Sequence, residues 1–192
     1  SHNADGSPNT SFGVNGQVTL ALGPTFDYSP EIAIQGDSFV IGLTVEYYPD
    51  VPMMGFANDN SYFGIAKVGM NGVLVSDFGS NGVVYVNPSS KNDIMYDMWA
   101  SDDAIYVAGT AGEDTEGGGK MVLGKVTKNG VLDTTFNSSG LWMEDFGKAN
   151  AYGFALAHGP DNMLYLGGAI SDLDKEGNGS ADFLFTLARI FP

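Results

Sequence analysis

The sequence predicts an all-β, propeller-like domain of three four-stranded sheets spanning residues 1–192. Three observations support this fold class. Asp-Gly and Asn-Gly pairs recur between short apolar runs, as at Gly6, Gly72 and Gly130, and such pairs mark tight turns. One phrase occurs three times, and no window carries a sustained helical period. We therefore expect strands throughout and no long helix.

The three copies of the phrase are ADGSPNTSFGVNGQVTLAL, MNGVLVSDFGSNGVVYV and KNGVLDTTFNSSGLWM. Their turn glycines are spaced by 66 and then 58 residues, and their phenylalanines Phe12, Phe78 and Phe136 have the same spacing. Equal spacing of two landmarks indicates a repeat of about 60 residues, a length typical of stacked or radial arrays.

Each repeat contains four apolar runs, which we name strands a, b, c and d. The expected ranges are a at 31–35, 95–100 and 152–157; b at 38–46, 104–110 and 163–170; c at 61–68, 120–126 and 183–190; d at 17–22, 83–86 and 141–144. The chain therefore reads d-abcd-abcd-abc. A lone sheet cannot bury two apolar faces, so the sheets should stack radially as propeller blades.

Strand c shows the pattern that stacking requires. Alternation places bulky residues and a final cation on one face and small residues on the other. The cations are Lys67, Lys125 and Arg189. Because they recur at one position, we expect them to pair with loop carboxylates such as Asp77 or Asp133 rather than to bind a ligand.

Several of these phrases resemble the delta-60 repeat, a bacterial propeller-like repeat. The matching stretches are DGSPNTSFG, NGVLDTTF, YVAG, GPDN and LARI. The resemblance covers nearly the whole chain, although Asn137 replaces the usual Gly and the insert at about 46–61 is atypical. It implies a secreted or surface-attached bacterial protein, extracellular in location, and no catalytic residues.

Three sheets of this size leave a wide wedge, so we expect a homo-oligomer that completes the ring. In a dimer, 17–22 of one chain would pair with 183–190 of the other and give six blades. A trimer, as in a fibre tip, and a piece of a longer array are the alternatives. Residues 1–3 resemble a tag remnant.

The b–c connections are long, at 46–61, 110–119 and 171–182, and long loops on a regular scaffold often carry function. Aromatic side chains in the first could contact a glycan or a protein, or could fold over the ring or a neighbouring subunit. The candidate ligand contacts are Tyr47, Tyr48, Phe56, Glu113 and Asp114.

The third connection places oxygen ligands at alternate positions, as calcium loops do. The candidate ligands are Asp172, Asp174, Glu176, Asn178 and Asp182. The distal bidentate Glu is missing, so a solvated acidic hairpin is the alternative. Calcium is the one cofactor this pattern suggests, and His158, in an a–b turn, has no catalytic partner nearby in sequence.

The net charge of −15 disfavours binding to nucleic acid, because it repels the phosphate backbone. No apolar run is long enough to insert into a membrane. With no cysteine, disulfides are excluded. We expect a non-catalytic recognition or adhesion module that binds a glycan or a protein. A structural fibre-tip or scaffold domain without its own ligand, and an enzyme acting on polysaccharide through two carboxylates, are the alternatives.

Overall fold

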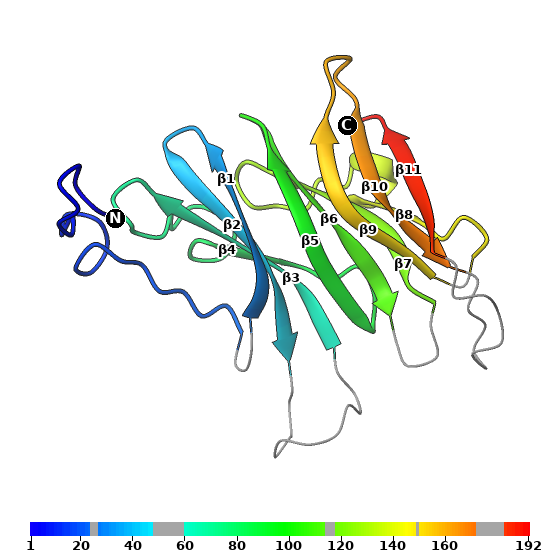
Figure 1. Cartoon of the computed structure of the whole chain (residues 1–192), viewed down its shortest axis with the longest axis horizontal. Helices are drawn as coiled ribbons and strands as arrows, with labels where there is room; N and C mark the ends of the chain where they lie inside the picture. Colours follow the sequence, from blue (N-terminus) through cyan, green and yellow to red (C-terminus); the bar gives the residue numbers. More distant parts are fainter. Residues whose placement is uncertain (24–26, 48–59, 114–117, 149, 172–182) are drawn as a thin grey trace.

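Three antiparallel sheets stack one after another along the chain in a computed structural model (Figure 1), which describes residues 1–23, 27–47, 60–113, 118–148, 150–171 and 183–192. The order of strands in the sheets is β1-β2-β3-β4, β5-β6-β7-β8 and β11-β10-β9. The strands of the first sheet are β1 (Asp27–Gln35), β2 (Ser38–Tyr47), β3 (Asn60–Gly69) and β4 (Val83–Val86). Those of the second are β5 (Asn92–Ala100), β6 (Ala104–Glu113), β7 (Lys120–Thr127) and β8 (Leu141–Glu144), and those of the third are β9 (Asn150–His158), β10 (Leu164–Ser171) and β11 (Leu184–Ile190).

The all-β prediction is confirmed, and a single 3-10 turn, Phe136–Ser138, is the sole helical element of the described residues. Each sheet is a simple meander, because consecutive strands are hydrogen-bonded neighbours. The sheets of one chain form an open stack, with β1–β4 and β9–β11 at its opposite ends (Figure 1).

The first predicted strand d, at 17–22, is wrong. Residues 18–22 belong to no strand, and Gln17 makes only an isolated bridge with Val14. Leu20 and Leu22 instead pack on the outer face of the first sheet, against Leu43 and Val45. A strand needs a partner for its backbone groups, and a strand c that could pair with 17–22 does not lie beside it among the described residues.

The two-faced pattern of strand c is confirmed. The bulky Phe63 and Ile65 of β3 pack in a core shared with the second sheet, where they join Met95 and Ile105. The smaller Ala66 packs on the opposite side, with Leu22 and Val45.

The second sheet repeats this arrangement one step along the chain. Met121 and Leu123 of β7 share a core with Leu164 and Leu166 of the third sheet. The first and second sheets therefore each present their bulky face to the sheet that follows in sequence.

Two side chains of the first sheet also satisfy backbone groups of β5, the edge strand of the second sheet. The Met95 N–H donates to Thr44 Oγ1 (2.9 Å), and the Asp93 N–H donates to Ser61 Oγ (3.0 Å). Both hydroxyls also donate to the carbonyl oxygens of the same two residues. These contacts are buried, so they hold the two sheets in one register.

The reciprocal contact at Thr44 gives a test with a matched control. Thr44→Val leaves the buried Met95 N–H without its acceptor, which costs about 1–3 kcal/mol of unfolding free energy. Thr110 holds the same position in β6, since Thr44 pairs with Phe63 and Thr110 with Met121. Its hydroxyl is buried and has no partner among the described residues.

Thr110→Val should therefore leave the unfolding free energy unchanged or raise it. Chemical denaturation of both variants measures the difference. Equal losses in the two variants would show that the cross-sheet hydrogen bonds do not stabilise the stack.

Candidate functional site

The outer face of the third sheet is apolar and exposed. Phe185 and Leu187 of β11 are 79% and 57% exposed. Phe183 is also exposed, and its ring lies 6.2 Å from that of Tyr152 on β9. A face of contiguous large apolar side chains is unusual on a monomeric protein and marks a contact surface.

In the other two sheets the equivalent face is covered by a neighbouring sheet. Phe63 and Met121 occupy the position of Phe185 on β3 and β7, and both are 0% exposed. Ile65 and Leu123 occupy the position of Leu187, and both are also 0% exposed. The same two positions are therefore core in two sheets and surface in the third, because no further sheet of the described residues packs on the third.

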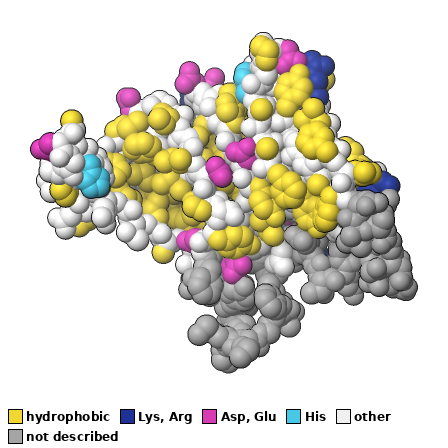
Figure 2. Space-filling model, in the orientation of Figure 1, with side chains coloured by type: hydrophobic (Ala, Val, Ile, Leu, Met, Phe, Trp, Pro, Cys, Tyr) yellow, Lys and Arg dark blue, Asp and Glu magenta, His cyan; other side chains and the backbone are white. Residues whose placement is uncertain are grey.

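The first sheet has the complementary open face. Ile32 and Ile34 of β1 are 66% and 64% exposed, and their partners Ile41 and Phe39 on β2 are half-buried. The equivalents of Phe39 and Ile41 on β6, Ile105 and Val107, are fully buried against the first sheet. Figure 2 shows hydrophobic side chains gathered over β1 and β2. We call the open apolar side of β1 and β2, with Ile32, Ile34, Phe39 and Ile41, the sheet-1 face. We call the open apolar side of the third sheet, with Phe185 and Leu187, the sheet-3 face.

The predicted pairing of the strand-c cations with loop carboxylates is confirmed for two of the three, Lys125 and Arg189. Lys125 Nζ lies 3.3 Å from Asp133 Oδ2 and over the ring of Tyr106. Burial lowers the pKa of Lys125, but Tyr106 and Asp133 outweigh burial, and the net pKa is raised.

Lys67 pairs with an amide instead of a carboxylate, and Arg189 pairs with a loop carboxylate other than the two named as examples. Lys67 Nζ donates to Gln35 Oε1 (2.8 Å) rather than to Asp77, and burial lowers its pKa, with Lys128 adding to the effect. Arg189 Nη2 donates to Asp161 Oδ2 (2.8 Å), a carboxylate of the a–b turn. Arg189 therefore lies at the rim of the sheet-3 face with its charge compensated.

Most of the predicted ligand-binding residues lie outside the described residues. Tyr47 ends β2 and Glu113 ends β6, and their side chains are not described. The other predicted ligand contacts lie outside the described ranges; they are Tyr48, Phe56 and Asp114. The same is true of the predicted calcium ligands, which are Asp172, Asp174, Glu176, Asn178 and Asp182. Both sites remain predictions.

Within the described ranges, no group of three or more His, Asp or Glu side chains is arranged to hold a metal ion. The ring of His158 stacks on Trp99 at 4.3 Å, and its Nε2 hydrogen-bonds to Asn162 (3.0 Å). These contacts give His158 a packing role in the turn. No helix of the described chain is both long and apolar enough to cross a membrane.

Asp93 is a fully buried carboxylate with a shifted pKa, a combination that can mark a functional group. Burial raises its pKa, and hydrogen bonds from Ser89 and Gly112 oppose the rise. The carboxylate accepts from Ser89 Oγ (2.6 Å), the Ser89 N–H (3.0 Å) and the Gly112 N–H (3.0 Å). With three donors directed at it, Asp93 joins the β4–β5 connection to the end of β6.

A comparison with protein-family models, curated proteins and solved structures finds no match to this chain. The resemblance to the delta-60 repeat therefore stays a prediction.

Asp93→Asn tests the structural role of this carboxylate. The amide NH₂ cannot accept a hydrogen bond, so at least one of the three donors loses its partner, at a cost of about 1–3 kcal/mol. Denaturant unfolding measures the loss. Asp102→Asn, at an exposed turn position, is the control and should unfold like the parent chain. An Asp93→Asn variant as stable as the parent would contradict the anchoring role.

Proposed function

We propose that the chain is a non-catalytic structural module that joins further sheets of its own kind into a propeller-like ring. The observation that supports it is the exposure of Phe185 and Leu187, at positions that are core in both other sheets. The two open faces lie at opposite ends of the stack, so each is available to a neighbour (Figure 1).

The size of the open faces favours association. Burying side chains the size of Phe185 and Leu187 contributes about 1.5–3 kcal/mol each. The net charge of −15 acts against it, because two copies of the chain repel each other. Salt screens this repulsion, so association should strengthen as ionic strength rises.

Leu187→Asp tests the proposal, because it places a charge in the sheet-3 face. Loss of one buried leucine weakens association at least about tenfold, given that 1.4 kcal/mol is a factor of ten. Sedimentation velocity over a range of protein concentrations measures the change, and circular dichroism checks that the variant is folded.

The control is Val131→Asp, which changes an apolar side chain that is 61% exposed but lies in a turn away from both faces. It should associate like the parent chain. A parent chain that stays monomeric at every concentration and ionic strength would contradict the proposal, as would equal effects of the two substitutions.

A second candidate is recognition of a glycan or a protein at a bacterial surface. The three b–c connections leave from the ends of β2, β6 and β10, and these ends lie along one edge of the stack (Figure 1). An edge at which all three of these strands end suits a shared contact surface. Binding on a glycan array that disappears when 48–59 is replaced by a short Gly-Ser linker would support this role.

A further inference from the structure

The N-terminal residues reproduce the c–d part of a repeat in detail. Each backbone hydrogen bond within residues 1–17 has a counterpart 66 residues later; for example, the Gly6 N–H donates to Asn3 O (2.9 Å) as the Gly72 N–H donates to Gly69 O (2.8 Å). The isolated bridge His2–Pro8 likewise corresponds to Val68–Leu74. Residues 1–17 therefore have the local structure of residues 67–83.

The turn before strand d is also the same in both segments. Gly13, Asn15 and Gly16 have φ angles of 57°, 54° and 82°, and the residues 66 positions later have φ angles of 54°, 54° and 94°. These left-handed conformations favour Gly and Asn. After this turn the second segment forms β4, so residues 17–20 hold the position of a strand d. No strand c lies beside them among the described residues.

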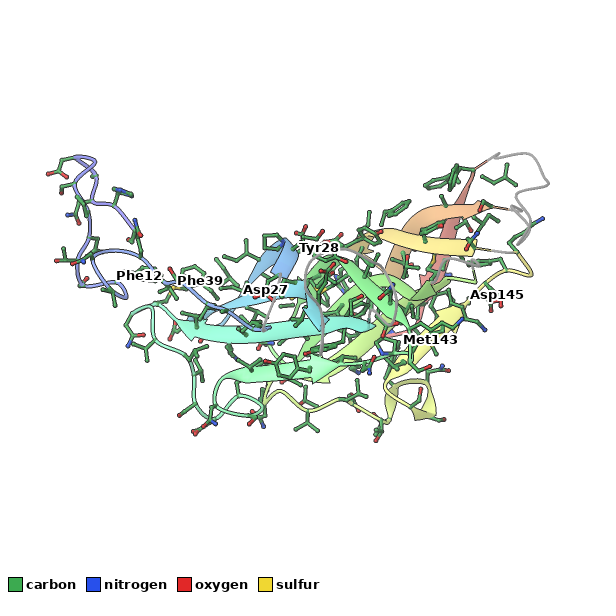
Figure 3. The ribbon with its side chains drawn as sticks, turned by 90° about the horizontal axis from the view of Figure 1, so that it is seen from below. Phe12, Asp27, Tyr28, Phe39, Met143 and Asp145 are labelled. Atoms are coloured by element: carbon green, nitrogen blue, oxygen red, sulfur yellow. The ribbon has the colours of Figure 1, made fainter. Side chains whose placement is uncertain are left out.

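The N-terminal segment also contacts the sheet after it as its counterpart does. The Gly13 N–H donates to Asn71 O (2.9 Å), and the Gly79 N–H donates to Asn129 O (2.8 Å). Leu20 packs on the first sheet as its counterpart Val86 packs in the core of the first and second sheets. Figure 3 shows the segment extending from the end of the stack, with Phe12 beside Phe39.

The third sheet has no strand d among the described residues, and the N-terminal segment has the turn and the sequence position of one. β3 and β7 each pair with a strand d, whereas β11 is an edge strand within the described residues. The N-terminal segment and β11 lie at opposite ends of one chain (Figure 1), so they cannot meet within it. They can meet between two copies.

Residue Ser1 occupies the place that an incoming β11 would take. Its amino group donates to Gly16 O, and its carbonyl accepts from the Asn9 N–H (3.0 Å). In the second segment these two bonds belong to Lys67, whose N–H donates to Gly82 O (2.9 Å) and whose carbonyl accepts from the Val75 N–H (2.9 Å). The equivalent of Lys67 on β11 is Arg189.

We propose that β11 of a second copy adds to residues 17–20 as the missing partner strand and displaces residues 1–3. The register of β3 with β4, carried over to these residues, gives Gln17↔Ala188, Val18↔Leu187, Thr19↔Thr186 and Leu20↔Phe185. This deepens the proposed function and rests on it. One docking event both completes the three-stranded sheet and lays the sheet-3 face on the sheet-1 face.

Disulfide trapping tests the register, because the chain has no cysteine of its own. The bond from the Lys67 N–H to Gly82 O makes that pair a hydrogen-bonded one, so by alternation Thr19↔Thr186 is a non-hydrogen-bonded pair. Its Cα atoms should lie about 4.5 Å apart, within the range that a disulfide spans.

Chains carrying Thr19→Cys and Thr186→Cys are mixed, oxidised mildly and analysed by non-reducing electrophoresis and mass spectrometry. We expect a cross-linked heterodimer in several-fold higher yield than from Thr19→Cys mixed with Ala188→Cys. The control pair is offset by two residues, at about 7–8 Å, which is too far for a disulfide. Equal yields from the two mixtures, or none from either, would overturn the proposal.

Removal of residues 1–3 is the second measurement, and it should raise the yield of the Thr19–Thr186 cross-link because Gly16 O is then free. An unchanged or lower yield would overturn the displacement of residues 1–3. Sedimentation of the unsubstituted chain separates the two proposals. If the chain associates but the cross-link does not form, the proposed strand pairing is contradicted and the proposed assembly function is not. If the chain is strictly monomeric, both proposals are contradicted.

Discussion

Packing of the bulky face of one sheet on the small-residue face of the next is the interaction on which the rest of the structure depends. A four-stranded meander has two apolar faces and no covering helix, so it cannot fold as an isolated unit. Phe63 and Met121 are buried because a following sheet exists, and Ile105 and Leu164 are buried because a preceding one does. Buried side-chain bonds such as Thr44 to Met95 then fix how the sheets are placed on each other.

The same interaction explains the ends of the stack. Among the described residues, no sheet covers the sheet-3 face, and the N-terminal segment alone lies on the sheet-1 face. That segment covers part of the sheet-1 face with Leu20 and Leu22, and leaves Ile32 and Ile34 exposed. Head-to-tail contacts of this kind use two different surfaces, so copies joined by them form either a closed ring or an open filament.

Sequence reasoning predicted the all-β fold of successive antiparallel sheets well and the details of the site poorly. Short apolar runs between turn pairs located eleven of the twelve predicted strands, since turns and alternation are local signals. These signals failed at 17–22, because strand formation depends on a partner that no local pattern reports. The bonds of Thr44 and Asp93 were missed for a similar reason: they join residues 51 and 19 positions away. Arg189 pairs with a loop carboxylate as expected, but that its partner is Asp161 of the a–b turn depends on loop geometry, which the sequence pattern does not report.

Amide hydrogen exchange of β11 and residues 17–20, followed as the protein concentration is raised, tests the central claim most directly. If another copy covers the sheet-3 face, protection appears in both segments together and rises with concentration, while the exchange of β10, a central strand, changes little. Exchange in β11 and 17–20 that is fast at every concentration, or protection that does not depend on concentration, would contradict an assembly built from stacked, interchangeable sheets.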